Sequence, residues 1–185
     1  MLSTTELFVE HIISGILSLV WIIAFMLCFT GVDPLMFAAI RDYWPVWLLV
    51  STAVAYPIGI FVDTVADLML EGLDRHTKLK HQLPADFSFL MKITNDTPEN
   101  IVSYFTYNRF KTRVARSSFV NFALIGFGWA LLLRLQGEVL GIDRPLAVSA
   151  VVFITFNLLA TTAFFLWWKI ANTVYQKAKR VWPEN

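Results

Sequence analysis

The sequence has few charged residues and a single cysteine. Charged side chains make up 16% of the chain, whereas about 25% is typical of soluble domains. The lone Cys28 excludes an intramolecular disulfide. No lysine or arginine precedes Ile12, so the chain lacks the basic region with which a secretory signal peptide begins. We therefore expect a membrane protein whose first apolar stretch is retained.

The sequence also lacks the patterns that carry common enzymatic chemistry. It has no phosphate-binding loop, no dinucleotide-binding fingerprint, no zinc-ligand spacing and no hydrolase arrangement of serine, histidine and aspartate. His76 and His81 lack the cluster of further ligands that a metal site requires. We predict that the protein is not an enzyme and binds neither a cofactor nor a metal.

What the sequence does contain is four uncharged stretches, at residues 12–32, 43–62, 117–133 and 145–168. A bilayer core about 30 Å thick is crossed by roughly 20 helical residues, and about 17 is near the lower limit. Four such stretches leave too little chain for a separate soluble domain. We predict an all-α membrane protein with four transmembrane helices, forming a single integral membrane domain over residues 1–185.

The basic residues predict which way the chain crosses the membrane. They concentrate in the middle segment and after residue 168, whereas the other two links hold only Arg41, Arg134 and Arg144. With four spans, the middle segment and both termini share one side, and the positive-inside rule assigns that side to the cytoplasm. We predict a multi-pass protein of the cell (inner) membrane with both termini in the cytoplasm.

The helical pattern continues beyond the second stretch. Thr97-Pro98-Glu99 is typical of a helix start that leads into the third stretch. We predict that the second and third helices extend as a cytoplasmic helical hairpin over about residues 63–116, and that Pro57 kinks the second helix. The apolar residues that continue the second helix recur at spacings of four, three and four: Val62, Ala66, Met69 and Leu73.

Two stripes of opposite charge follow this predicted hairpin. An arginine can bind one carboxylate through two parallel hydrogen bonds. Charges close to hydrocarbon are costly unless they are paired with an opposite charge. One interpretation is therefore an interhelical salt-bridge ladder that stiffens the hairpin. The other is an ion path or a gating switch at the mouth of a pore. In an antiparallel register the predicted pairs are Asp63 with Arg116, Asp67 with Arg113, and Glu71 with Arg109.

Polar residues also occur inside the apolar stretches. Such side chains usually hold membrane helices together, although they can also line a water-filled path. Both interpretations stay open for Asn121 in the third stretch and for four residues of the fourth: Ser149, Thr155, Asn157 and Thr161.

Two further surfaces are candidates for binding. Basic residues of the middle segment can contact anionic lipid head groups, or alternatively an anionic nucleotide or oligonucleotide; these are Arg75, Lys78, Lys80 and Lys111. The predicted loop carries the apolar residues Phe87, Phe89 and Met91. A loop with so much apolar surface is expected to pack against another surface. Its partner is another subunit, the membrane surface or a cytoplasmic protein.

These features predict an oligomeric membrane channel or pore-type effector, controlled from its cytoplasmic hairpin by a ligand or partner. We expect a homo-oligomer in the lipid bilayer, because four spans offer little buried interface. The alternative is a non-conducting membrane anchor or sensor that recruits a cytoplasmic protein. In size, span number and charged hairpin, the chain resembles small four-span membrane effectors and sensors of bacterial anti-phage defence systems such as Hailong and Kiwa. This resemblance implies an oligomer whose activation damages the cell.

Overall fold

The computed structural model describes residues 4–32, 41–84, 88 and 97–181, and four long helices account for most of them. Each helix is long and apolar enough to cross a membrane, and the described part of the chain contains no strand. The predicted all-α class is therefore confirmed for this part of the chain, and its four long apolar helices indicate a multi-pass membrane protein. The helices are α1 (Thr4–Thr30), α3 (Trp44–Lys80), α5 (Glu99–Gln136) and α6 (Pro145–Val181).

The ends of these helices follow from local chemistry. α1 ends at Thr30 because Gly31 adopts a positive φ of 80°, which glycine reaches without steric cost. α6 begins with Pro145. Proline has no backbone N–H, and this costs nothing in the first turn of a helix, where the N–H groups have no acceptor within the helix. α3 continues through Pro57 as one helix.

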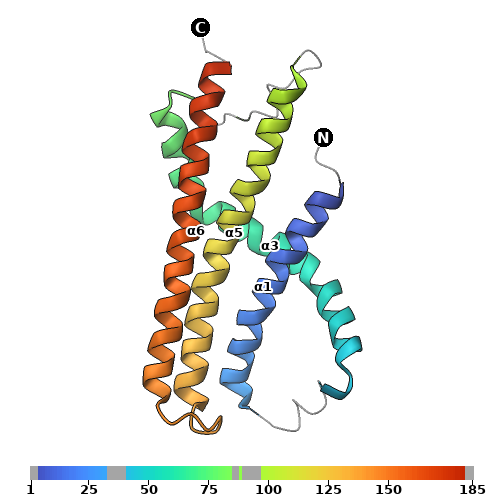
Figure 1. Cartoon of the computed structure of the whole chain (residues 1–185), viewed down its shortest axis with the longest axis vertical. Coiled ribbons are helices and arrows are strands. Elements are labelled where there is room, and N and C mark those ends of the chain that lie inside the picture. Colours follow the sequence, from blue (N-terminus) through green and yellow to red (C-terminus); the bar gives the residue numbers. More distant parts are fainter. Residues whose placement is uncertain (1–3, 33–40, 85–87, 89–96, 182–185) are drawn as a thin grey trace.

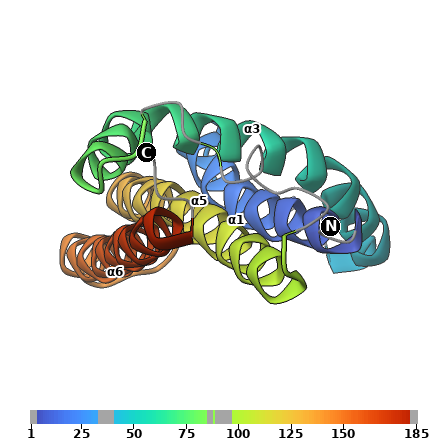
Figure 2. The same ribbon diagram turned by 90° about the horizontal axis from the view of Figure 1, so that it is seen from above.

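α5 and α6 form an antiparallel pair along most of their lengths (Figure 1). Close approach is possible near Gly126, where a Cβ atom would lie only 2.7 Å from the Cβ of Phe156. Ser149 adds a buried hydrogen bond of 2.8 Å to the carbonyl oxygen of Ala130. α1 packs against α5 and α3, and α3 crosses obliquely from the α1 side of the bundle to α6 (Figure 2).

Two glycines bring α1 and α3 together near the middle of α3. A Cβ added to Gly15 would lie 1.7 Å from the carbonyl oxygen of Ala55, and one added to Gly59 would lie 1.8 Å from that of His11. Small residues allow such backbone contact between membrane helices. The two glycines therefore fix where α3 crosses α1.

α1 and α5 begin, and α3 and α6 end, at the same end of the bundle, here named the charged end (Figure 1). The predicted two-helix hairpin is not supported there, because α6 also extends past its apolar stretch and contacts α3. The Tyr175 hydroxyl donates a 2.6 Å hydrogen bond to Asp74, and His81 Nε2 lies 3.2 Å from Asn172 Oδ1. A buried cluster joins all three extensions: Leu83, Phe105, Val174 and Ala178.

Candidate functional site

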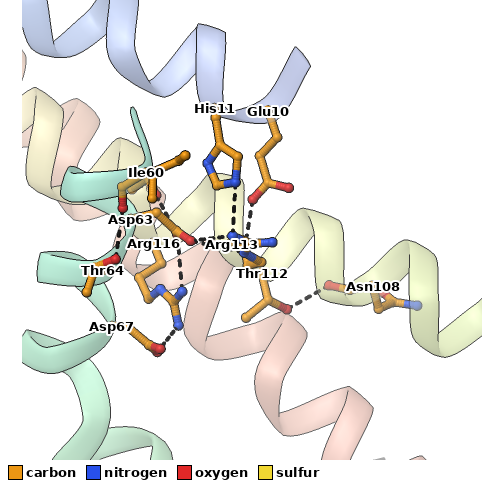
Figure 3. A network of polar contacts seen from close by, with 11 residues as sticks. Glu10, His11, Ile60, Asp63, Thr64, Asp67, Asn108, Thr112, Arg113 and Arg116 are labelled. Carbon is orange, nitrogen blue, oxygen red and sulfur yellow. Dashed lines mark hydrogen bonds and ion pairs between the residues drawn. The ribbon is translucent and has the colours of Figure 1, made fainter. Parts of the chain in front are cut away.

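The candidate site is a network of charged side chains where α1, α3 and α5 meet, next to the apolar parts of the helices (Figure 3). Its centre is Asp63, which is 7% exposed. Arg113 donates to one carboxylate oxygen through Nη2 at 2.6 Å and Nε at 3.1 Å. Arg116 Nη2 and Ser117 Oγ donate to the other, at 3.1 and 3.0 Å. The carboxylate is therefore well satisfied although it is buried.

The sequence positions these groups through helical spacing. Arg113, Arg116 and Ser117 lie three and four residues apart on α5 and so share one face, which is turned toward α3. Asp63 follows immediately after the apolar stretch of α3, so it reaches the same level as Ser117. Charges placed this close to hydrocarbon require partners, which the two arginines provide.

Glu10 and His11 of α1 also belong to the network, which the sequence analysis did not predict. Glu10 is 3% exposed, and its Oε1 lies 3.2 Å from Arg113 Nε. Neither of its carboxylate oxygens accepts a hydrogen bond from the residues that the structure describes. His11 Nε2 lies 3.5 Å from Arg113 Nη2. The signal in the sequence is that both residues immediately precede the first apolar stretch, as Asp63 immediately follows the second.

The predicted register of the charge ladder is formed only in part. Asp63 pairs with Arg116 as predicted. Asp67 does not pair with Arg113 but with Arg116, and its side chain is 68% exposed. Arg116 therefore connects a buried carboxylate to one that faces water.

The third predicted pair, Glu71 with Arg109, is not formed. Glu71 is exposed, and Arg109 has no ion pair with any described residue. The physical reason is that α3 crosses α5 obliquely and turns toward α6, where Asp74 binds Tyr175 (Figure 2). The two charge stripes therefore diverge beyond Asp67.

This divergence opens a polar cavity of about 290 Å³ between α3, α5 and α6. Its walls include Asp67 and Asp74 of α3, Arg109 and Arg116 of α5, and Tyr175 of α6. Asp74 is held by Tyr175 and, at 3.0 Å, by Lys78. Arg109 remains the wall residue whose guanidinium can pair with an incoming anionic group.

Deeper in the bundle, Asn121 holds α1 against α5. Its side chain is fully buried, and its Oδ1 accepts hydrogen bonds from Ser18 Oγ at 2.8 Å and Trp21 Nε1 at 3.0 Å. Its Nδ2 donates to the carbonyl oxygen of Ser14 at 3.2 Å. Asn121 thus acts in helix packing in the structure, as does Ser149 through its bond to α5.

Among the described residues, the other polar side chains in the apolar stretch of α6 form no such bonds to another helix. Asn157, Thr161 and Thr162 each donate to a carbonyl oxygen one turn earlier in α6. Thr155, Thr161 and Thr162 are exposed on the surface of the single chain. This surface is available to lipid or to another copy of the chain.

The other predicted binding residues are scattered over the charged end. Lys78 is bound to Asp74, and Lys111 lies 4.2 Å from the centre of the Tyr107 ring. Arg75 and Lys80 are exposed. Phe87, Phe89 and Met91 lie outside the described residues.

Within the described part of the chain, no group of three or more histidine, cysteine or acidic side chains could hold a metal ion. The features of the site are its ion pairs and the adjoining cavity. No protein-family model, curated protein or solved structure matches the chain.

Proposed function

We propose that the chain is the subunit of an oligomeric membrane channel or pore-type effector, controlled at its charged end by a ligand or partner. The observation that carries this proposal is the ion-pair network, which joins α1, α3 and α5 where their apolar parts end and borders a cavity of about 290 Å³. A ligand in that cavity would act directly on the contacts between three transmembrane helices.

The network provides a physical basis for switching. Arg113 and Arg116 share Asp63, so a change at either arginine alters the pairing of the other. Arg116 also reaches Asp67 at the wall of the cavity. A buried charge that loses its partner is costly, so one ion pair of the network can break only if another forms. Such a network therefore favours a few discrete arrangements of the helices over a gradual change.

Conduction requires several copies of the chain. The polar groups of Asn121 and Ser149 are used within the subunit, so a water-filled path would form between subunits. The exposed threonines in the apolar stretch of α6, Thr155, Thr161 and Thr162, are the residues we assign to such a path. The hydroxyls of Thr161 and Thr162, or the α6 carbonyl oxygens that accept their hydrogen bonds, would then face water.

The orientation and setting form part of the proposal. The charged end carries the basic residues of the middle segment and of the C-terminal part of α6, so the positive-inside rule assigns it to the cytoplasm of a cell (inner) membrane. The resemblance to four-span effectors of anti-phage systems supports a role in defence, in which opening would depolarise the infected cell.

The experiment that tests the proposal is ion flux from liposomes that contain the purified protein. We expect flux in the wild type, and a change of at least severalfold in Asp67→Asn, which removes the water-facing partner of Arg116. Glu71→Gln is the matched control, because Glu71 is an exposed acid of the same helix segment with no ion pair to a described residue. Liposomes that stay tight, or identical flux in both variants, would contradict the proposal.

A second candidate function is a non-conducting anchor or sensor that recruits a cytoplasmic protein. It is favoured by the observation that the buried polar groups of α5, at Asn121, and of α6, at Ser149, bond within the subunit. This candidate predicts tight liposomes together with retention of a soluble partner by the membrane-bound protein. The flux experiment therefore separates the two functions.

A further inference from the structure

The cavity between α3, α5 and α6 has one charged wall residue without an ion-pair partner among the described residues. This residue is Arg109, which is partly buried on α5. Its guanidinium carries five N–H donors, and a charge removed from water is costly unless an opposite charge lies beside it. An anionic group in the cavity would supply that charge.

The three acids of the wall are held by other residues. Both oxygens of Asp63 accept hydrogen bonds from α5. The two oxygens of Asp74 are occupied by the Tyr175 hydroxyl and, at 3.0 Å, by Lys78. Asp67 binds α5 through Oδ1, and its side chain is otherwise largely exposed to water. None of these acids therefore compensates the charge of Arg109 directly.

Arg116 offers a further donor in the same wall. Its two terminal nitrogens bind Asp63 and Asp67 (Figure 3), but its Nε is buried and has no acceptor among the described residues. Arg109 and Arg116 lie seven residues apart on α5, about two helical turns, so they share one face of this helix. A group with several anionic oxygens can accept hydrogen bonds from both.

The cavity has room for more than such a group alone. Its volume of about 290 Å³ is roughly twenty times what one water molecule requires. The α6 side of the wall includes apolar side chains, which suit an organic part of a ligand: Trp167, Ala171 and Val174. The cavity therefore matches an anionic group that is attached to a larger molecule.

We infer that the cavity binds a phosphate-bearing ligand, with Arg109 as its anchor and Arg116 as its second contact. Guanidinium groups bind phosphate through charge-assisted, often paired hydrogen bonds. A phosphate ester has three oxygens to share between two arginines, whereas a carboxylate has two. The phosphate can belong to a soluble organic molecule or to a lipid head group. The inference rests on the proposed function, because it names the chemical class of the ligand at that site.

A phosphate in this position would act on the network through Arg116. It would compete for that arginine with Asp67, the more exposed of its two carboxylate partners. Asp67 also repels an anion in the cavity, so its charge opposes binding while the charge of Arg109 favours it. Removing the one charge or the other should therefore change the affinity for phosphate in opposite directions.

The test is the melting temperature of the purified protein in detergent, titrated with inorganic phosphate or with chloride at equal ionic strength. A ligand that binds the folded protein raises this temperature. We expect Arg109→Gln to weaken the apparent affinity about tenfold, as the loss of hydrogen bonds to a charged group implies. Asp67→Asn should tighten it severalfold. Lys80→Gln and Glu71→Gln are the matched controls, since each removes an exposed charge of the same sign at the same end, and both should bind as the wild type does.

A second titration identifies the source of the phosphate. The same variants are melted in dodecyl maltoside micelles with and without phosphatidylglycerol. A shift that requires Arg109 and occurs only with inorganic phosphate assigns a soluble ligand, and one that occurs only with phosphatidylglycerol assigns a lipid. Such shifts with both probes mean that the cavity accepts the group from either source. General stabilisation by phosphate salts acts alike on all variants and so does not imitate these results.

Two results would overturn the inference. These are the absence of a shift with either probe, and shifts in Arg109→Gln as large as those in the wild type or in Lys80→Gln. Unchanged affinity in Asp67→Asn would contradict the competition at Arg116. If phosphate binds as expected but the liposomes stay tight, the ligand site stands and the channel fails. If Asp67→Asn alters flux while neither probe shifts the melting temperature, the channel stands and its ligand is not a phosphate.

Discussion

The guanidinium of Arg113 lies between two carboxylates that belong to different helices. It donates to Asp63 of α3 at 2.6 and 3.1 Å, and its Nε lies 3.2 Å from Oε1 of Glu10 of α1. Both carboxylates are almost fully buried. One arginine of α5 therefore compensates two buried charges, so its removal affects three helices at once.

Arg113→Ala should destabilise the protein strongly. It would leave Glu10 without its nearby cation and Asp63 with Arg116 alone, and breaking a buried pair typically costs about 3–5 kcal/mol. The measurement is unfolding of the purified protein in detergent. Arg109→Ala is the matched control, because Arg109 has no ion pair with a described residue, and it should cost less than about 1 kcal/mol. Equal losses in the two variants would contradict this role for Arg113.

Gly15→Ala should separate α1 from α3. The new methyl group would lie 1.7 Å from the carbonyl oxygen of Ala55, so the helices must move apart, and overpacking of this kind costs about 1–3 kcal/mol. The melting temperature in detergent reports the effect. Gly72→Ala serves as the control, because nothing lies within 4 Å of the added carbon. It should stabilise α3 by roughly 0.5–1 kcal/mol through helix propensity. A melting temperature for Gly15→Ala at or above that of the wild type would show that the close crossing is absent.

Asn121→Leu should weaken the contact between α1 and α5. The substitution removes the acceptor of Ser18 and Trp21, and interhelical hydrogen bonds in membranes contribute about 0.6–2 kcal/mol. Thr161→Val is the comparison, because that hydroxyl bonds only to the backbone of α6, and its loss should change unfolding by less than about 0.5 kcal/mol. If both variants unfold alike, Asn121 does not join the helices.

The predicted orientation can be measured independently of function. A green fluorescent protein fused after Asn185 should fold and fluoresce, because the C-terminus is predicted to lie in the cytoplasm. Alkaline phosphatase fused at Gly141, in the link between α5 and α6, should be active on the opposite side. The reverse pattern of the two reporters would invert the topology and place the cavity outside the cell.

The sequence was sufficient for the helices but not for their arrangement. Four uncharged stretches predict four spans, because length and hydropathy alone decide which helices can cross a bilayer. The path of α3 depends instead on the contact between Gly15 and Ala55, two positions on different helices. Glu10 was missed for the same reason, since its partners depend on how α1 packs.

The extension of α6 could have been predicted. Beyond Trp168 its buried residues recur at spacings of three and four: Ala171, Val174 and Ala178. By contrast, no pattern shows that Thr161 and Thr162 bond to their own helix, because a hydroxyl in a membrane helix can turn inward or outward. The choice between pore lining and packing therefore depends on tertiary contacts.

The glycine contact between α1 and α3 has a mechanical consequence. It clamps α3 near its midpoint, while the first half of that helix, from Trp44, is largely exposed within the single chain. Pro57 lies inside this contact and donates no hydrogen bond to the preceding turn, so α3 has its weakest point where α1 holds it. Bending at this point would change the direction of the half of α3 that carries Trp44 and Trp47, while the other half keeps its contacts with α5 and α6.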